Sequence, residues 1–276
     1  MIEIDMIRKG FTLMELLVAM GVLTLLMSLL VPALTGARQQ SYAIQCSSNL
    51  HHLALSFRMY ESEQKTFPYG FDSLAYNMQA PPAGYAGNPS YDRVGWWWFD
   101  FLADTLGKQI GDQPLYRCPS RKIEDKGMKE NVLWGNYGVN QSICKSSAGR
   151  LIQEEFIGPP LTLDQIAQPS LTLLITDGGY SMVHWWHVTE QPPYDLGRTM
   201  EDGAYIPGLD INQGRSFRSF QQDDARNGRH PARKVNVGFA DGHVQRVAAD
   251  ELRVDKVEPA RFIHLNPLWR PARSAN

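Results

Sequence analysis

Near its amino terminus the chain carries an unbroken run of apolar positions. The run extends from Phe11 to Leu34, and Glu15 is the only charged residue among these 24 positions. As a helix rising about 1.5 Å per residue, it would be about 36 Å long, enough to span the roughly 30 Å hydrocarbon core of a bilayer. Because Arg8 and Lys9 precede the run, the short leader is predicted to stay in the cytoplasm. The pattern predicts one membrane span.

Two simpler interpretations of this run remain open. A cleaved secretory signal would be followed by small residues, as found at 35–37, although its apolar part is usually only about 7 to 15 residues long. A plain membrane anchor would tolerate Glu15 near the interface, where a long side chain reaches polar surroundings. A carboxylate near the centre of a span costs roughly 2 to 3 kcal/mol. Glu15 is therefore a candidate functional residue by position alone.

A second apolar pattern follows, with a spacing of three and four residues. Its members are Ala43, Leu50, Leu53, Ala54, Phe57 and Tyr60. This spacing puts them on one face of a helix, so the helix is predicted to continue to about Glu63. Such a stripe is typical of core packing, and we expect a globular domain to pack around it.

After Lys65 the pattern changes to loops and short strands. Segments 81–85 and 87–91 are rich in Pro, Gly, Asn and Tyr and do not sustain a helix. The aromatic segment Trp96–Leu106 is predicted to be a short helix capped by Gly107, with its rings in the core; a carbohydrate-binding surface is the alternative. Strands are predicted at Val132–Asn140, Leu171–Asp177 and within Lys234–Ala248.

The last of these segments is predicted to be a β-hairpin. Apolar residues alternate with small or polar ones from Val235 to Phe239. The dipeptide Asp241-Gly242 suits a two-residue type I′ turn, which would place Phe239 opposite Val244. One long helix followed by loops and a small antiparallel sheet is an α+β fold.

Four segments are therefore expected. They are a leader at 1–10, the membrane-spanning half of one long helix at 11–34, the half of the same helix outside the membrane at 35–64, and a globular domain at 65–276 that includes the hairpin at 234–248. A hydrophobic content of 43% with 17 Pro and 23 Gly excludes collagen, low complexity and extensive disorder. The net charge of −2 gives no indication of polyanion binding, so we expect no nucleic-acid partner.

The start of the apolar run matches a known kind of signal. Residues 9–18 read KGFTLMELLV, which resembles the class III signal of type IV pilins and type II secretion pseudopilins. The resemblance implies that a prepilin peptidase cuts between Gly10 and Phe11 and that the new amino terminus of Phe11 is methylated. It also implies that Glu15 pairs with the Phe11 amine of a neighbouring subunit, which gives each buried charge a partner. Pro32 falls where such helices bend, and because proline lacks an amide hydrogen we expect a kink there.

Short motifs are also spread over the rest of the chain. They are CSSNL at 46–50, FP at 67–68, RCPS at 117–120, NYGVN at 136–140 and the segment from His230 to Asp241-Gly242. Together they are similar to a group of pilin-like proteins with a carboxyl-terminal H-X9-DG signature, known mainly by inference as secretion pseudopilins. In this chain ten residues separate His230 from Asp241, one more than in the signature.

The three cysteines, Cys46, Cys118 and Cys144, lack the spacing of a zinc site. Since disulfides persist in an oxidising periplasm, we predict a bridge between Cys46 and Cys118. It would close a loop of about 70 residues and stabilise the fold by roughly 4 kcal/mol on the chain-entropy model. A bridge between Cys118 and Cys144, or three free buried thiols, are the alternatives.

Metal or catalytic chemistry has weaker support. His184 and His187 form a His-x-x-His pattern, but Trp185 and Trp186 occupy the positions between them where a metalloprotease needs a glutamate. Other candidates at predicted strand ends are Asp177, Asp241 and His243. Calcium would need hard oxygen ligands, for which the candidates are Asp195, Asp202, Asp210, Asp223 and Asp224. No spacing selects a ligand set, so solvated loop carboxylates are the default interpretation and no cofactor is firmly expected.

These features predict a structural subunit and not an enzyme. The resemblance implies a pseudopilin of a type II secretion-like filament, held in the inner membrane by one span with its carboxyl-terminal domain in the periplasm. Its expected partners are the prepilin peptidase, other pilin-like subunits and an inner-membrane assembly platform. The alternatives are a type IV pilus subunit and a membrane-anchored periplasmic hydrolase or carbohydrate-binding protein.

Overall fold

The computed structural model describes residues 12–271 apart from 75–93, 107–113, 124, 126, 128–130, 148–154, 194–203 and 259–260. The predicted leader and cleavage site, including Gly10 and Phe11, lie outside the described residues. The chain divides into two compact units, Met1–Ser41 and Tyr42–Asn276.

A single long helix begins the described chain. Helix α1 covers Leu13–Gln64, 52 residues, which confirms the predicted amino-terminal helix. Its large apolar side chains in the first unit are exposed, from 81% at Leu13 to 52% at Val22. By length and composition, α1 is the one helix in the described part of the chain that could cross a membrane. The helix continues through Pro32, and the kink expected there stays a prediction.

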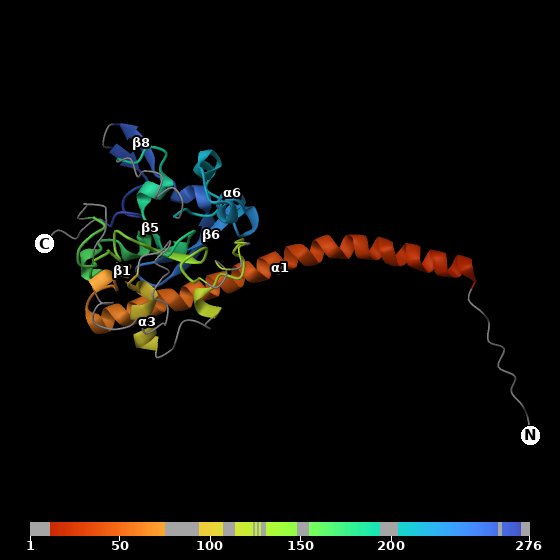
Figure 1. Ribbon diagram of the computed structural model, residues 1–276, viewed down its shortest axis with the longest axis horizontal. Coiled ribbons are helices and arrows are strands. Elements are labelled where there is room, and N and C mark those ends of the chain that lie inside the picture. The colour runs from red at the N-terminus through yellow and green to blue at the C-terminus, as the bar shows by residue number, and fades with distance from the viewer. Residues whose placement is uncertain are drawn as a thin grey trace, which may run out of the picture. The chain divides into compact units, whose positions relative to one another are not determined.

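The second unit combines the end of α1 with short helices, turns and strands (Figure 1). Among the described residues of this unit, the other α-helices are α3 (Trp98–Leu106) and α6 (Gln222–Asn227). The strands are β1 (Phe71–Asp72), β2 (Trp96–Trp97), β3 (Tyr137–Asn140), β4 (Leu173–Asp177), β5 (Met182–Val183), β6 (Lys234–Phe239), β7 (Val244–Ala248), β8 (Asp255–Glu258) and β9 (Arg261–Ile263). The 3-10 turns are η1 (Pro114–Tyr116), η2 (Leu163–Gln165), η3 (Pro169–Leu171), η4 (Trp185–Val188), η5 (Asp210–Gly214), η6 (Ser219–Gln221), η7 (Pro231–Arg233) and η8 (Ala249–Leu252).

The central sheet has five strands in the order β5-β3-β4-β6-β7. Its pairs are antiparallel except for β3 with β5, which is parallel. Strands β1 with β2 and β8 with β9 form two further antiparallel pairs. One long helix with small, mostly antiparallel sheets confirms the predicted α+β class.

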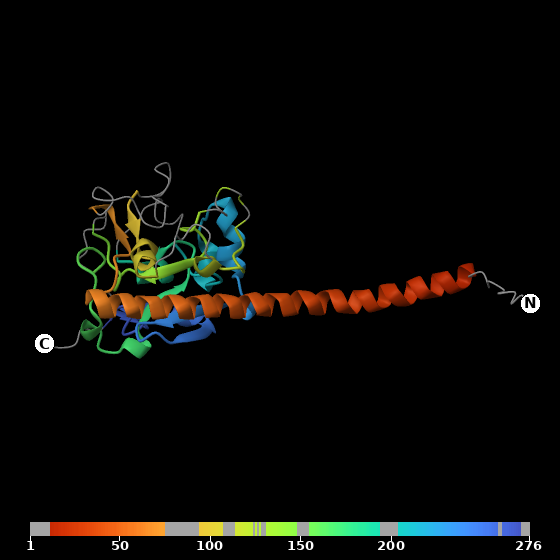
Figure 2. The same ribbon diagram turned by 90° about the horizontal axis from the view of Figure 1, so that it is seen from below.

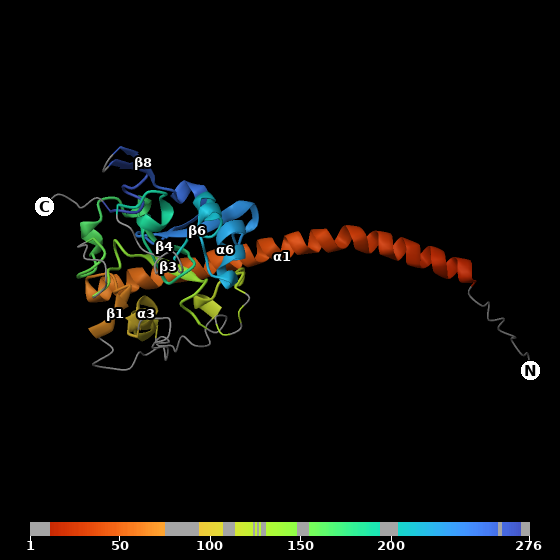
Figure 3. The same ribbon diagram turned by 45° about the horizontal axis from the view of Figure 1, so that its top comes forward.

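The carboxyl-terminal part of α1 packs between α3 and the sheet (Figures 2 and 3). Phe57 of α1 contacts Trp98 of α3, with ring centroids 5.5 Å apart. On the sheet side, a Cβ at Gly238 of β6 would lie 3.5 Å from the Cβ of Ala54 and 2.9 Å from Ile175. Gly238 therefore allows the close approach of strand and helix. The predicted apolar stripe is confirmed as core packing.

A second hydrophobic core lies away from α1. Its members include Trp185, Trp186, Val235, Val237, Phe239 and Trp269. Because successive side chains of a strand alternate between faces, β6 contributes its valines and Phe239 to this core while Gly238 approaches α1. This alternation is the one that the sequence pattern predicts.

The hairpin is present, but its predicted register is wrong by one residue. Val244 pairs with Gly238 and not with Phe239. The loop contains three residues, because the amide of Gly242 donates to the carbonyl of Phe239 at 2.9 Å and the amide of Phe239 donates to the carbonyl of His243 at 2.9 Å. Gly242 has a φ of +99°, as in a three-residue loop that ends in a left-handed glycine. The Asp-Gly turn was predicted, and the additional loop residue was missed.

Other predicted elements are shorter than expected. Strand β3 begins at Tyr137, because the Asn136 side-chain amide donates to the carbonyls of Val132 and Trp134 and keeps that segment in turns. The turn Pro169–Leu171 delays β4 to Leu173. In the aromatic segment, Trp96–Trp97 is a strand and the helix begins at Trp98. The aromatic rings of residues 97–99 are buried, which supports the prediction that this segment packs in the core. The predicted cap, Gly107, lies outside the described residues.

Candidate functional site

The first site surrounds the start of α1. The carboxylate of Glu15 accepts hydrogen bonds from the amide and the hydroxyl of Thr12, both at 2.9 Å, and the Thr12 hydroxyl accepts one from the amide of Glu15 at 3.2 Å. This reciprocal arrangement caps the free amides of the first helical turn. Glu15 is exposed. Among the described residues, the hydrogen-bond partner of its carboxylate is therefore Thr12, three residues earlier.

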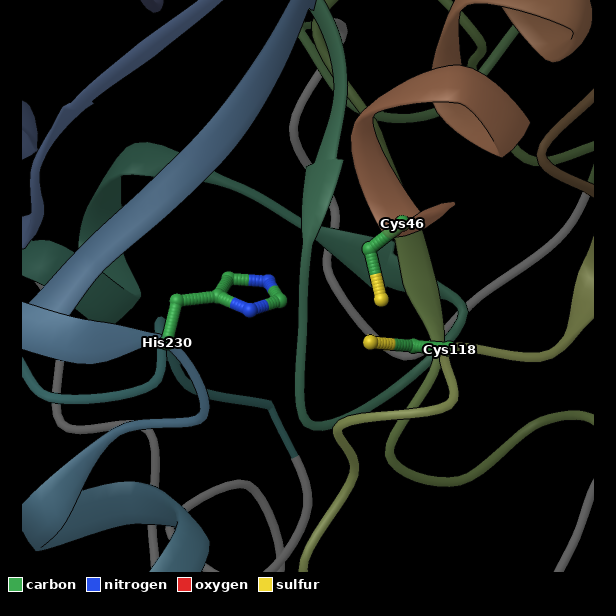
Figure 4. Close-up of side chains that lie close together, drawn as sticks. All are labelled: Cys46, Cys118 and His230. Atoms are coloured by element: carbon green, nitrogen blue, oxygen red, sulfur yellow. The ribbon is translucent and has the colours of Figure 1, made fainter. Parts of the chain in front are cut away.

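The second site is a buried cluster of three side chains. Cys46 comes from α1, Cys118 from the loop after η1, and His230 from the residue before η7. One ligand atom from each lies within 4.8 Å of the other two. Figure 4 shows the His230 imidazole pointing towards the two sulfur atoms. All three residues are at least 96% buried, with exposures of 0%, 1% and 4%.

Asparagine side chains hold the cysteine loop against the helix. Asn49 of α1, almost one helical turn after Cys46, donates to the carbonyls of Pro114 at 3.1 Å and Arg117 at 3.2 Å. Asn136 accepts a hydrogen bond from the amide of Cys118 at 3.0 Å. These bonds fix Cys118 beside Cys46 through the backbone, so the closeness of the thiols is built into the fold.

His230 is held from the opposite side by a carboxylate. Its Nε2 lies 3.0 Å from Oδ2 of Asp177, the last residue of β4. The same carboxylate oxygen accepts the backbone amide of Asn236 at 2.7 Å and its side-chain amide at 3.1 Å. The antiparallel pairing of β4 with β6 brings these residues together. The other ring nitrogen, Nδ1, is buried and makes no hydrogen bond of normal geometry among the described residues; the His230 side chain interacts with the Cys118 thiol.

The loop after His230 accommodates the additional residue of this chain. Ala232 and Arg233 both adopt positive φ angles, +58° and +51°. The Arg233 guanidinium donates to the carbonyl of Gly208. The longer approach loop therefore curls locally, and His230 still reaches Asp177.

The charges of the cluster are set mainly by burial. Burial raises the pKa of the Cys118 thiol well above its usual range; the adjacent Cys46 thiol adds to this rise and His230 opposes it. Burial alone would lower the pKa of His230, but the Asp177 carboxylate outweighs burial and raises it to about 9. Burial would raise the pKa of Asp177, yet His230, Arg229 and the Asn236 amide lower it. The Cys118 thiol is therefore protonated and poorly nucleophilic at neutral pH.

The predicted disulfide is neither formed nor excluded by this arrangement. Cys46 and Cys118 lie side by side, whereas all three cysteines are free thiols. Cys144 is buried elsewhere in the core and does not join the cluster. The bridge between Cys46 and Cys118 stays a prediction.

The remaining signature residues lie in the hairpin turn. Asp241 is exposed, and its Oδ1 lies 2.6 Å from Nδ1 of His243. The His243 ring stacks on Phe239 with centroids 4.3 Å apart. The Asp241-Gly242 dipeptide thus forms the turn, while His230 belongs to the buried cluster.

The other candidate ligands are dispersed. His184 and His187 are buried with ring centroids 3.8 Å apart, and no third metal-ligating side chain joins them among the described residues. Asp210 and Asp223 form ion pairs with Arg233 and Lys122. Asp224 is buried against Arg229 at 2.8 Å. Asp195 and Asp202 lie outside the described residues.

Sequence reasoning missed the connection between the cysteine pair and His230. It paired Cys46 with Cys118 and selected His230 and Asp177 separately, because 184 positions separate Cys46 from His230 along the chain. A prediction that the strand ending at Asp177 pairs with the strand following His230 would have brought these two residues together. The roles of Asn49 and Asn136, which are hydrogen-bonded to the loop, carried no signal beyond their presence in two short motifs.

Comparison with known proteins identifies the amino-terminal segment. Residues 5–31 match the family model described as a prokaryotic N-terminal methylation motif. No significant match is found among curated proteins or among solved structures. The motif overlaps the start of α1 and includes Glu15. The segment is therefore a prepilin-type methylation segment, and it supports a type IV pilin-like family for the chain.

Proposed function

We propose that this protein is a pseudopilin, a structural subunit of a type II secretion-like periplasmic filament. The observation that carries the proposal is the methylation motif at 5–31, which leads directly into an exposed apolar helix long enough to cross a bilayer. A helix of this kind stores the subunit in the inner membrane by a single pass. The same helix enters the filament when the subunit is extracted.

Processing would occur between Gly10 and Phe11. A prepilin peptidase removes residues 1–10, including the charged pair Arg8-Lys9, and the new amine of Phe11 is methylated. Removal of the leader matters because its positive charges oppose extraction of the helix from the cytoplasmic face. Other pilin-like subunits and an inner-membrane assembly platform are the partners that this cycle requires.

Glu15 would change partners during assembly. In the single subunit its carboxylate is bonded to Thr12, close to the polar surroundings of the interface. In the filament it meets the Phe11 amine of a neighbouring subunit, and the two opposite charges compensate each other in an apolar environment. Glu15 would therefore make a specific charge contact during assembly, whereas the rest of the segment makes only apolar contacts.

Nothing in this function requires catalysis. The buried thiols and histidines described above have no access to a substrate, and a filament subunit acts through its surfaces. The globular second unit, fixed to the helix through its core, is the part that would lie outside the membrane.

Intact-mass spectrometry tests the proposal. The full chain is produced with and without a prepilin peptidase, beside a Gly10→Val variant that blocks the scissile bond. We expect loss of residues 1–10 and gain of one methyl group only for the parent chain with peptidase. An unprocessed parent chain in the presence of active peptidase would contradict the proposal. Recovery of processed chain in sheared surface filaments, and not in the periplasm, would favour a pilus subunit.

A further inference from the structure

The cluster of Cys46, Cys118 and His230 has a chemistry that filament assembly does not use. Two sulfur atoms and one imidazole nitrogen lie within 4.8 Å of one another in a fully buried part of the second unit. Thiolates and imidazoles are the donors preferred by zinc and copper(I). The donor set therefore specifies soft metal ions and not calcium or magnesium.

His230 has the outer partner that metal-bound histidines usually have. Its Nε2 is hydrogen-bonded to Asp177 at 3.0 Å, and Asp177 is itself held by the amide of Asn236 at 2.7 Å. Ligating histidines commonly direct their second nitrogen to a carboxylate, which fixes the ring and its tautomer. The remaining nitrogen, Nδ1, is buried and makes no hydrogen bond of normal geometry among the described residues, although the Cys118 thiol is close enough to interact with the His230 side chain. A buried polar atom without such a bond is costly, and a metal ion would satisfy it.

The ligands are also fixed in advance. Cys118 is held through its amide by Asn136 at 3.0 Å, and the carbonyl before it is held by Asn49 of α1 at 3.2 Å. The Tyr137 hydroxyl donates to the carbonyl of Cys46 at 3.4 Å. Ligands held by the backbone lose little conformational freedom when an ion binds.

We propose that Cys46, Cys118 and His230 bind one thiophilic metal ion, Zn²⁺ or Cu⁺, with Asp177 as the outer-sphere carboxylate of His230. Binding forms two metal–sulfur bonds and one metal–nitrogen bond. The protons of both thiols, and any proton on the ligating nitrogen, leave to solvent. With Zn²⁺ the two thiolates balance the charge, and three protein ligands leave a fourth position for water. With Cu⁺ the three ligands complete the coordination.

The metal and the predicted disulfide compete for the same two sulfurs. A disulfide would use Cys46 and Cys118 alone and would leave Nδ1 of His230 without a partner. A metal ion uses all three side chains of the cluster and also explains the carboxylate behind the imidazole. The arrangement thus favours the metal, and this inference does not depend on the filament function.

Metal analysis of the full-length protein tests the inference. The chain is produced in cells supplied with Zn²⁺ or, in a separate arm, with copper, and is purified in detergent with a phosphine reductant and no chelator. Elemental analysis then gives the metal content per chain. We expect about one ion per chain in one of the two arms, and that arm identifies the metal. A rise in unfolding temperature of the loaded protein over the chelator-treated protein is a second readout.

Matched variants locate the ion. Cys46→Ser and Cys118→Ser should each lose the bound metal by tenfold or more, and His230→Gln, which keeps a group able to bond Asp177, should lose about 10 to 100-fold in affinity. Cys144→Ser removes a buried cysteine outside the cluster and should keep the full metal content. Since a variant that fails to fold would also lack metal, near-ultraviolet circular dichroism of each metal-free variant is compared with that of the parent.

Three results would overturn the inference. The first is a folded, reduced parent chain without stoichiometric metal in either arm. The second is a folded double variant of Cys46 and Cys118 that retains the metal content of the parent. The third is a disulfide between Cys46 and Cys118 in protein recovered from the cell envelope, without added reductant, from cells supplied with both metals. This last result would confirm the disulfide predicted from the sequence.

Discussion

The two parts of helix α1 have the same secondary structure and opposite surroundings. Before Tyr42 its leucines, valines and methionines are exposed, with Leu23 at 54%. After Tyr42 one face is completely buried, and Leu50, Leu53 and Phe57 are each 0% exposed. The first part is apolar on all sides, whereas the second is apolar on one stripe. A helix surrounded by lipid requires the first pattern, and a helix packed on one side against a domain requires the second.

This difference teaches that the partner of a helix can be read from the width of its apolar surface. The second part has its partners within the chain, because Ala54 lies against β6 and Phe57 against α3. The first part has no such partners among the described residues. In our proposal its partners are the bilayer and the helices of other subunits.

The largest expected effect comes from removing the single acid of the first part. Glu15→Leu should leave membrane insertion and cleavage intact, because the segment becomes more apolar. In the filament, however, the Phe11 amine would lose its partner, and an uncompensated buried charge costs about 3 to 5 kcal/mol. We therefore expect filament assembly to be lost. The yield of sheared filaments, measured beside the processed subunit in membranes, checks this result.

Thr12→Val is the matched control for that experiment. It removes the hydroxyl that bonds Glu15 at 2.9 Å but keeps the carboxylate. Loss of a helix cap costs only about 1 kcal/mol, so filaments should still form. If Glu15→Leu subunits assembled as well as the parent, charge pairing would be wrong and the acid would have no role in assembly.

Leucine-to-alanine substitutions in the two parts of α1 should differ in their effect on the free energy of unfolding. Leu53→Ala should lower the free energy of unfolding of the second unit by about 2 to 5 kcal/mol, because it opens a cavity in a fully buried core. Leu23→Ala, on the exposed part, should change it by less than about 0.5 kcal/mol. All seven tryptophans lie in the second unit, so denaturant unfolding followed by tryptophan fluorescence reports on that unit alone. Equal losses for the two variants would show that the helix is one energetic unit.

A smaller effect of pH is expected from the second core. Burial, with a contribution from Arg215, lowers the pKa of His184 to about 3. Below pH 6.5 the unfolded chain binds a proton that the folded chain does not, so stability falls as the pH falls. Between pH 6.5 and pH 5 this histidine alone should remove about 2 kcal/mol.

His184→Phe isolates that effect. The ring already stacks on Phe156 with centroids 4.6 Å apart, and its nitrogens have no hydrogen-bond partner among the described residues. The variant should therefore lose less stability than the parent between pH 6.5 and pH 5 when unfolding is measured at both values. The exposed His51→Phe serves as the control and should follow the parent. A variant with an unchanged pH dependence would contradict the role given to His184.

Periodicity and turn chemistry predicted the elements whose partners are local. The long helix and the apolar stripe after Pro32 follow from residue spacing alone, and the Asp-Gly turn follows from the need for a positive φ at Gly242. The hairpin register was missed by one residue because Ala240 joins the loop. Apolar alternation indicates which face a residue occupies, but it does not indicate the length of the loop.

The buried cluster shows the limit of sequence reasoning. Cys46 and Cys118 were paired from the sequence, and the fold does bring them together, but their third neighbour was not predicted. The position of His230 depends on a β4–β6 pairing and on an approach loop with two left-handed residues. Such contacts between distant segments are set by tertiary packing, which leaves no periodic signal in the chain.

The most direct test of the central claim is mass spectrometry of sheared filaments from cells that contain the assembly machinery. The account predicts that the filaments contain this chain, that it begins at Phe11, and that its amino terminus carries one methyl group. Filaments that lack the chain, or a chain that keeps residues 1–10 while the peptidase processes its other substrates, would contradict the claim that this protein is a pilin-like filament subunit.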